Sequence, residues 1–355
     1  MAIQPHIVAD ISANGFGHLA QVSPILEELA AEQEIRLTLR TEVDLEICSQ
    51  FLSVPFEIGP PPPDPNMRMK GPLDVDVEGL FADYRKLIGE WDQMISADAD
   101  LLGTLKADLV ISNIAVASLA SASAAGIPVA GICSLNWADV FATYCGSDGE
   151  AGEVLERLTE NYNKADRVIQ LAPHMPMEWL KETRSVGPVA RRGENRRDEL
   201  EALRPANHYV LATMGGIPGM HTEVPLPMLD GVVWIVPPEW EGVREDWLSR
   251  ARFDIPFIDL MRSSDALVTK AGYGSVTECA VNGTRILYTE RTNWCETPML
   301  EEWMAEPCTA RRVEREVMQA GNFAAELEKI LAIPVEPPIE PTGAAEAAAV
   351  LQELI

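Results

Sequence analysis

The stretch Ser264–Gly283, which reads SDALVTKAGYGSVTECAVNG, constrains the fold of this chain most strongly. It begins with a short apolar run, Ala-Leu-Val, which is typical of a buried strand. Gly272 and Gly274 follow, and a helical pattern then runs from Ser275 to a normal helix end at Asn282–Gly283. A strand, a glycine turn and a helix in this order expose backbone N–H groups at the positive end of a helix dipole, where a phosphate can bind.

A local explanation competes with phosphate binding at this turn. Ser275 and Glu278 have the spacing of a capping box, in which the two side chains satisfy the first N–H groups of their own helix. Strand–glycine–helix turns also occur throughout α/β proteins. The turn alone therefore leaves both interpretations open.

Strand and helix patterns alternate along the whole chain, which predicts parallel α/β structure. Helical spacing is present at Ala20–Ala31 and at Asp74–Ser96. The uncharged stretch Leu109–Ala138 is better explained as strand, helix and strand inside a sheet than as a membrane span, because Pro128 interrupts it. At 355 residues, the length suggests about two domains. The predicted strands are Ile7–Ile11, Ile35–Leu39, Ala107–Ser112, Gly126–Ala130, Ala165–Ile169, Tyr209–Thr213 and Val232–Val236.

The turn after the first predicted strand offers a rival nucleotide site. The run Gly15–Ala20 matches the dinucleotide fingerprint G-x-G-x-x-A, and Glu42 or Asp44 could be the acidic residue that binds the ribose. The fingerprint turn should begin directly after the strand, whereas Gly15 comes several residues later. An enzyme that uses NAD(P) or FAD is therefore an alternative interpretation.

Composition excludes several kinds of partner. The chain carries 28 Lys and Arg against 55 Asp and Glu, a net charge of −27, so binding to nucleic acid or to an anionic membrane is not expected. The six cysteines are scattered without a C-x-x-C pair, which predicts reduced thiols rather than disulfides or a zinc site. With no signal peptide or transmembrane segment visible, we expect a cytoplasmic protein.

Two larger patterns resemble a known superfamily. The unit Gly-x-Gly-Ser-x-x-Glu, helix, Asn-Gly, strand and acidic loop Asn293–Pro298 resembles the donor-binding segment of GT-B nucleotide-sugar glycosyltransferases, such as UDP-glycosyltransferases and the peptidoglycan N-acetylglucosaminyltransferase type. In the first half, the Gly-x-Gly-His turn and a D-x-V-I-x-D … G-I-P pattern resemble the acceptor domain, although Asn113 stands where many members have Asp.

This resemblance implies an α/β fold of two Rossmann-like domains that face a cleft. Residues 1–190 would form the acceptor domain, residues 205–334 the nucleotide-sugar donor domain, and residues 335–355 a tail helix that packs back on the first domain. The implied activity is inverting, metal-independent transfer of a sugar to an unknown hydroxyl acceptor. The donor would be a nucleotide sugar, which we expect to be UDP-linked. That acceptor would be a small molecule or lipid-linked, and no further cofactor is expected.

The resemblance also assigns roles to single residues. His18 would be the general base, since an imidazole titrates near neutrality. Asp139 or Asp10 could orient it, and the sequence does not choose between them. Glu278 would accept both ribose hydroxyls. The acceptor side would include Asn14, Gly15 and Gly17. The donor-binding residues would be Gly215, Gly216, Lys270, Gly272, Gly274, Ser275, Glu278 and Glu296.

Departures from the family pattern keep other functions open. Lys270-Ala271 replaces the usual His-Gly pair, and Glu296-Thr297 stands where many relatives carry Asp-Gln to hold the donor sugar. A nucleotide-sugar epimerase or hydrolase, and a non-catalytic protein that binds sugar nucleotides, are therefore alternatives, since fold alone does not decide among them. The arginines at 191, 192, 196 and 197 are expected to lie in a solvated linker; screening a phosphate is the other interpretation.

Overall fold

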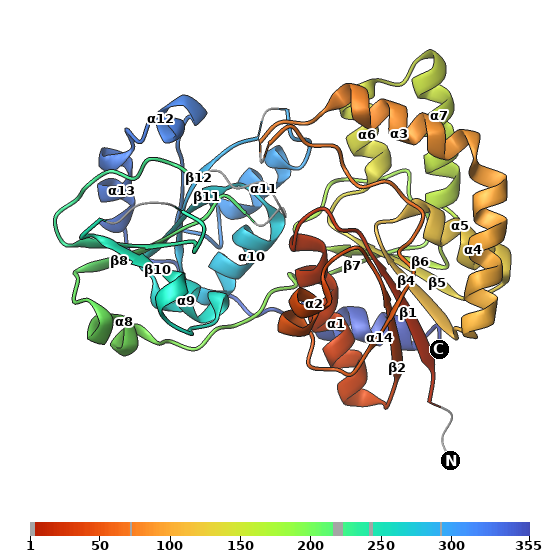
Figure 1. Ribbon diagram of the computed structural model, residues 1–355, viewed down its shortest axis with the longest axis horizontal. Coiled ribbons are helices and arrows are strands. Elements are labelled where there is room, and N and C mark those ends of the chain that lie inside the picture. The colour runs from red at the N-terminus through yellow and green to blue at the C-terminus, as the bar shows by residue number, and fades with distance from the viewer. Residues whose placement is uncertain (1–3, 72, 216–222, 241–243, 292) are drawn as a thin grey trace. The chain divides into compact units, whose positions relative to one another are not determined.

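The computed structural model describes residues 4–71, 73–215, 223–240, 244–291 and 293–355. The chain divides into two compact units (Figure 1). The first unit extends to Met69 and also includes Val75–Val189 and Thr342–Ile355. The second unit consists of Lys70–Asp74 and Ala190–Pro341.

The first unit is built on seven parallel strands in the order β3-β2-β1-β4-β5-β6-β7. The order reverses between β1 and β4, the point of an α/β sheet at which ligands commonly bind. In the register of this pair, Ile11 lies beside Asn113, so the loops after the two strands start side by side. The strands are β1 His6–Ile11, β2 Arg36–Arg40, β3 Glu57–Gly59, β4 Leu109–Asn113, β5 Val129–Cys133, β6 Arg167–Leu171 and β7 Thr183–Val186.

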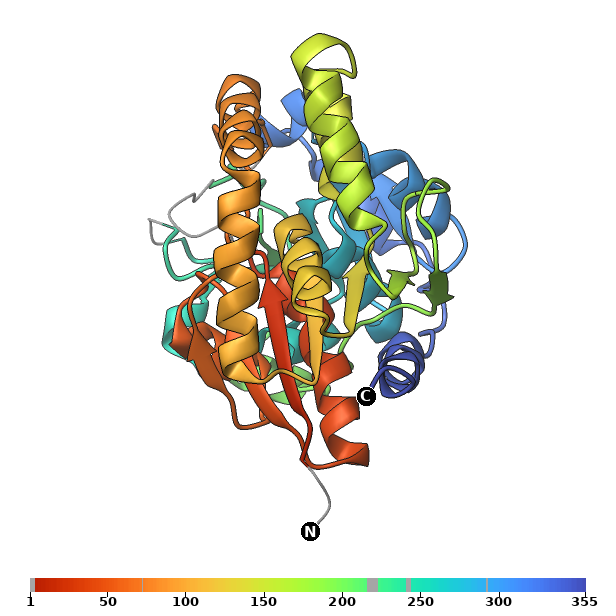
Figure 2. The ribbon, with the colours of Figure 1, turned by 90° about the vertical axis from the view of Figure 1, so that its right-hand side faces the viewer.

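Helices cover this sheet and bury its apolar strands. The last helix, α14, packs against α1 (Figure 1), and α4 packs along α5 (Figure 2). The helical pattern at 74–96 forms two helices rather than one, because the chain breaks at Glu90. The helices are α1 Gly17–Glu32, α2 Leu45–Phe51, α3 Val77–Gly89, α4 Trp91–Leu105, α5 Val116–Ala125, α6 Trp137–Cys145, α7 Gly149–Tyr162 and α14 Gly343–Gln352.

The second unit is a sheet of six parallel strands in the order β10-β9-β8-β11-β12-β13. Side chains alternate across it: Tyr209 and Leu211 join the core on one face, and Val210 and Ala212 join the core on the other. The strands are β8 His208–Ala212, β9 Val232–Val236, β10 Trp247–Ser249, β11 Ala266–Lys270, β12 Arg285–Thr289 and β13 Ala310–Arg312. The helices are α8 Arg197–Leu203, the 3-10 turn Arg250–Arg252, α9 Phe257–Ser263, α10 Tyr273–Asn282, α11 Thr297–Met304, α12 Arg315–Gln319 and α13 Ala324–Leu331.

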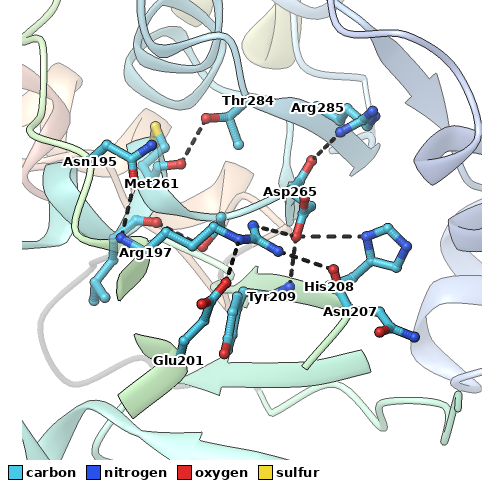
Figure 3. Close-up of polar contacts among 12 residues, drawn as sticks. Asn195, Arg197, Glu201, Asn207, His208, Tyr209, Met261, Asp265, Thr284 and Arg285 are labelled. Atoms are coloured by element: carbon cyan, nitrogen blue, oxygen red, sulfur yellow. Dashed lines mark hydrogen bonds and ion pairs between the residues drawn. The ribbon is translucent and has the colours of Figure 1, made fainter. Parts of the chain in front are cut away.

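A polar network joins α8 to the amino ends of β8 and β11 (Figure 3). Asp265 Oδ2 accepts hydrogen bonds from Arg197 Nη1 at 2.9 Å and from the Tyr209 backbone N–H at 2.8 Å. Arg197 Nη2 also donates to the Asn207 carbonyl at 3.0 Å. The other three arginines of this basic segment pair with carboxylates of the same unit, so its charge is balanced locally: Arg191 with Glu278, Arg192 with Glu340 and Arg196 with Glu199.

The prediction of two parallel α/β sheets is confirmed, and every strand predicted from the sequence is present within about three residues of its expected bounds. All six cysteines are free thiols. No helix in the described part of the chain is long and apolar enough to cross a membrane.

Candidate functional site

His18 lies in the first turn of α1, at the point where the first sheet reverses its strand order. Its Nδ1 is 2.7 Å from Asn113 Oδ1, at the carboxyl end of β4. The ring centroids of His18 and Trp137 are 5.8 Å apart. The imidazole is partly buried, so one of its nitrogens is fixed by the protein while the ring remains near the surface.

Neither carboxylate expected to orient His18 does so, and these two expectations were wrong. Asp10 is fully buried and forms an ion pair with Arg40 at 3.3 Å. Asp139 accepts hydrogen bonds from Trp179 Nε1 at 3.0 Å and from Asn136 Nδ2 at 2.7 Å. The side chain that contacts His18 Nδ1 is the amide of Asn113, whereas the sequence predicted a carboxylate.

The three residues predicted on the acceptor side shape the loop that leads to His18. Gly15 has a φ of 82°, in the left-handed region that favours glycine. Asn14 Oδ1 accepts a hydrogen bond from the Met67 backbone N–H at 2.6 Å, which ties this loop to the chain after β3. A Cβ added at Gly17 would meet no atom within 4 Å among the described residues. Asn14 and Gly15 therefore have clear structural roles, whereas Gly17 has open space beside it.

The first unit also holds two buried carboxylates, Asp10 and Asp98, and a partly buried one, Asp64. Arg40 bridges Asp10 and Asp98, and its Nε donates to the Pro60 carbonyl at 2.9 Å. Asp64 accepts hydrogen bonds from the first N–H groups of α5, at 2.7 Å from Val116. Burial raises the pKa of Asp10 to about 6 and the pKa of Asp64 to about 7.

In the second unit, the N-cap residue of α10 is a glycine, which has no side chain to cap the helix. The helix begins at Tyr273 with Gly272 as its N-cap, two residues earlier than the sequence pattern indicated. Ser275 is therefore inside the first turn and is not the N-cap, so the competing explanation by a capping box between Ser275 and Glu278 was wrong. A Cβ added at Gly274 would meet no atom within 4 Å among the described residues. The first N–H groups of a helix point out of its start, where an anion can bind.

Lys270, the last residue of β11, lies buried beside the turn that follows β8. A Cβ at Gly215 would come within 2.9 Å of Lys270 Cε, and Gly215 also has a φ of 90°, so this position favours glycine twice over. Burial lowers the pKa of Lys270 well below its usual value, and the charge of Arg291 lowers it further. The predicted site residue Gly216 lies outside the described residues.

Glu278 and Glu296 are both buried and both already have protein partners. Glu278 lies 3.5 Å from Arg191 Nη2, and burial raises its pKa. Glu296 Oε2 accepts a hydrogen bond from Trp294 Nε1 at 3.1 Å, and the Arg291 guanidinium lies 4.4 Å from the Trp294 ring centroid. Any hydroxyl that these carboxylates hold must share them with Arg191 and Trp294.

The second unit brings most of the predicted donor residues together, at the carboxyl ends of β8 and β11 or in the first turn of α10. These residues are Gly215, Lys270, Gly272, Gly274 and Ser275. Sequence reasoning missed Arg191 and Trp294 as partners of the two glutamates. It also missed Gln21, which contacts Asn113. One signal in the sequence pointed to this contact: Asn113 stands where many members of the resembled superfamily have Asp, so the expected carboxylate is missing.

No family model matches this chain. L-arabinokinase from Arabidopsis thaliana is 22% identical over 360 residues. The match covers 97% of this chain and 34% of that protein, so the chain spans about a third of the length of this curated relative.

Solved structures resemble the chain over its whole length. The spinosyn forosaminyltransferase SpnP has a TM-score of 0.61 at 15% identity, covering 99% of this chain and 95% of its own. A calicheamicin glycosyltransferase has a TM-score of 0.61 at 16% identity, with 100% and 94% covered. A UDP-glucosyltransferase from Polygonum tinctorium has a TM-score of 0.61 at 14% identity, with the same coverage. Two parallel α/β sheets in this topology, matched from end to end, give the chain the GT-B glycosyltransferase fold.

Proposed function

We propose that the protein is a glycosyltransferase that moves a sugar from a nucleoside diphosphate sugar, UDP-linked, to a hydroxyl acceptor. The observation that supports this most is the glycine N-cap at the start of α10, two residues after the buried amine of Lys270. A nucleoside diphosphate is an anion that such a helix start can bind. The nucleoside diphosphate would be the leaving group, through an oxygen of its β-phosphate, and Glu278 would hold the ribose.

The reaction follows from the charges that each group would have to stabilise. His18 would take the proton of the acceptor hydroxyl as the oxygen forms a bond to the anomeric carbon. The bond from that carbon to the diphosphate oxygen would break, and its electron pair would leave with the diphosphate. The helix dipole of α10, Lys270 and Arg291 would stabilise that charge without a metal ion. A single displacement of this kind inverts the anomeric centre.

The 22% sequence identity to L-arabinokinase supports a second candidate function, that of a sugar kinase, which would bind ATP. Thermal shift separates the candidates, because a ligand that binds only the folded state raises the melting temperature. UDP and UDP-sugars should raise it if the protein is a glycosyltransferase. A shift with ATP alone would favour the kinase, and a shift with NAD(P) alone would favour the dinucleotide enzyme.

Two glycines provide a matched test of where the nucleotide binds. Gly274 and Gly17 each lie in the first turn of a helix, and a Cβ at either would meet no atom within 4 Å among the described residues. Alanine should therefore be tolerated at both, and in a helix it is favoured over glycine by about 1 kcal/mol. We expect Gly274→Ala to weaken UDP binding at least 10-fold, the effect of about 1.4 kcal/mol of lost contact. Gly17→Ala should leave the calorimetric affinity unchanged.

The opposite pattern, with binding lost only in Gly17→Ala, would place the nucleotide on the first glycine turn and overturn the proposal. Equal affinity in both variants would remove the start of α10 from the site. The melting temperatures of the free variants are the control, since neither substitution should lower them.

The lowered pKa of Lys270 leads us to expect that the protein takes up a proton when the nucleotide binds. That pKa is lowered by burial and by Arg291, whereas a diphosphate beside Lys270 would favour the charged form. Binding should therefore take up a proton, and affinity should fall as pH rises above the pKa of Lys270 in the free protein. Calorimetry at one pH in two buffers with different ionisation enthalpies measures this uptake.

Lys270→Arg should bind the nucleotide without taking up a proton, because a guanidinium stays protonated. Lys329→Arg, on α13, is the matched control. Equal binding enthalpies in both buffers for the wild type would contradict the prediction.

A further inference from the structure

The hydrogen bonds around Asn113 determine which of its amide atoms faces His18. Asn113 Nδ2 lies 3.0 Å from the Ile132 carbonyl oxygen and 3.0 Å from Gln21 Oε1. A carbonyl oxygen can only accept, so the atom that faces it must be the amide nitrogen. The opposite orientation would set two oxygens against each other in a fully buried place. The oxygen of Asn113 is therefore the atom that faces His18.

This orientation fixes the proton on His18. An amide oxygen has no hydrogen to donate, so the contact of 2.7 Å requires that Nδ1 of His18 carries the proton and donates it. In the neutral ring, the lone pair then belongs to Nε2. This is the form of imidazole that can accept a proton through Nε2 from a substrate hydroxyl.

The residues that hold Asn113 are themselves held. Gln21 Nε2 donates to Ser134 Oγ at 3.0 Å. Asn113, Gln21 and Ser134 are all at least 94% buried, and they come from β4, α1 and the loop after β5. None of the three carries a charge, in contrast to a carboxylate, which would both orient the ring and stabilise its protonated form.

We propose that Asn113 is the positioning residue of His18, and that its amide, held by Ile132 and Gln21, fixes the Nδ1–H tautomer without supplying a negative charge. This inference rests on the proposed role of His18 as the general base. The tautomer itself can be measured without any substrate, so the two can fail separately.

Nitrogen-15 NMR of the histidine side chains in the full chain tests the proposal directly. At a pH above the titration of His18, the wild type should show the proton on Nδ1. His18→Gln identifies the signal by its absence. A wild-type ring with the proton on Nε2 would overturn the proposal, whatever any variant does.

Asn113→Leu removes the acceptor while roughly keeping the size of the side chain, so the preference for Nδ1–H should be lost. Gln21→Leu should keep that preference, because the Ile132 carbonyl still orients the Asn113 amide. Asn161→Leu is the matched control: Asn161 is another fully buried asparagine of the first unit, and its amide donates to the Arg157 carbonyl instead. An unchanged tautomer in Asn113→Leu would overturn the proposal. If that variant does not fold, the wild-type tautomer decides.

Once an acceptor is known, the same variants can be compared by activity. Asn113→Leu should lower kcat roughly 10–100-fold, the scale for a misplaced catalytic group, and leave KM for the donor unchanged. In the background of His18→Ala it should cost nothing further, because it acts through His18. Additive losses would overturn the proposal. The wild type could show the Nδ1–H tautomer while His18→Ala keeps full activity. Asn113 would then still be the residue that orients His18, and only the role of His18 as the base would be refuted.

Discussion

Replacing His18 by alanine should lower kcat about 10²–10⁴-fold, the usual contribution of a general base. Donor affinity should remain nearly unchanged, since the proposed donor residues belong to the second unit and His18 to the first. Asparagine at the same position should not restore the rate, because an amide does not accept a proton near pH 7. The wild-type rate should also decrease on the acid side, where the imidazole is protonated and cannot act as a base.

The control for this loss is His174→Ala. His174 also belongs to the first unit, but its nitrogens contact the Met175 carbonyl and Ser185 Oγ. Steady-state kinetics with an identified acceptor should show normal turnover for this variant. Full activity in His18→Ala would remove His18 from the mechanism. Loss of nucleotide binding in His18→Ala would instead point to a nucleotide site on the Gly15–Ala20 turn.

Replacing Arg40 by leucine should destabilise the first unit by about 3–5 kcal/mol near pH 7, as expected when one partner of a buried ion pair is removed. Arg40 is fully buried, and the change would leave Asp10 and Asp98 without their shared cation. The cost should be smaller at pH 5. Asp10 already has its pKa raised to about 6, and without Arg40 it would protonate still more readily.

The sign of the pH dependence follows from the direction of the shift. The pKa of Asp10 is higher in the folded protein than its value of 3.8 in the unfolded chain, so its protonation favours folding. This contribution to the free energy of unfolding is fully present below pH 3.8 and is lost as the pH rises through about 6. Denaturant unfolding at pH 5 and pH 7.5 measures the effect. Arg36→Leu is the matched control on the same strand: Arg36 is exposed and pairs with Glu57 at 2.8 Å, so little should change. Equal stability of the two variants at pH 7.5 would contradict the prediction.

The alternation of apolar runs with helical spacing was sufficient to predict both sheets, because strands buried on two faces have a strong local pattern. The short strands β3, β7, β10 and β13 have three or four residues each, too few to show a pattern, and they went unrecognised. The start of α10 was misplaced because Ser275 and Glu278 match a cap by spacing alone.

The candidate site was harder to predict than the fold. His18 could be singled out from its glycine turn, but its partner Asn113 is 95 residues away, and only the pairing of β1 with β4 brings them together. Likewise, nothing local joins Arg191 to Glu278, which are 87 residues apart. Side chains that orient or neutralise a functional group come from distant strands, so their identity depends on the tertiary structure.

The contact of α14 with α1 has a consequence for how the protein is made. The buried face of α14, with Ala347, Ala348 and Leu351, belongs to the first unit, yet the ribosome adds it after all of the second unit. Until those residues emerge, α1 lacks the helix that packs against it in the folded protein. The half of the protein that is synthesised first is therefore the half that finishes folding last.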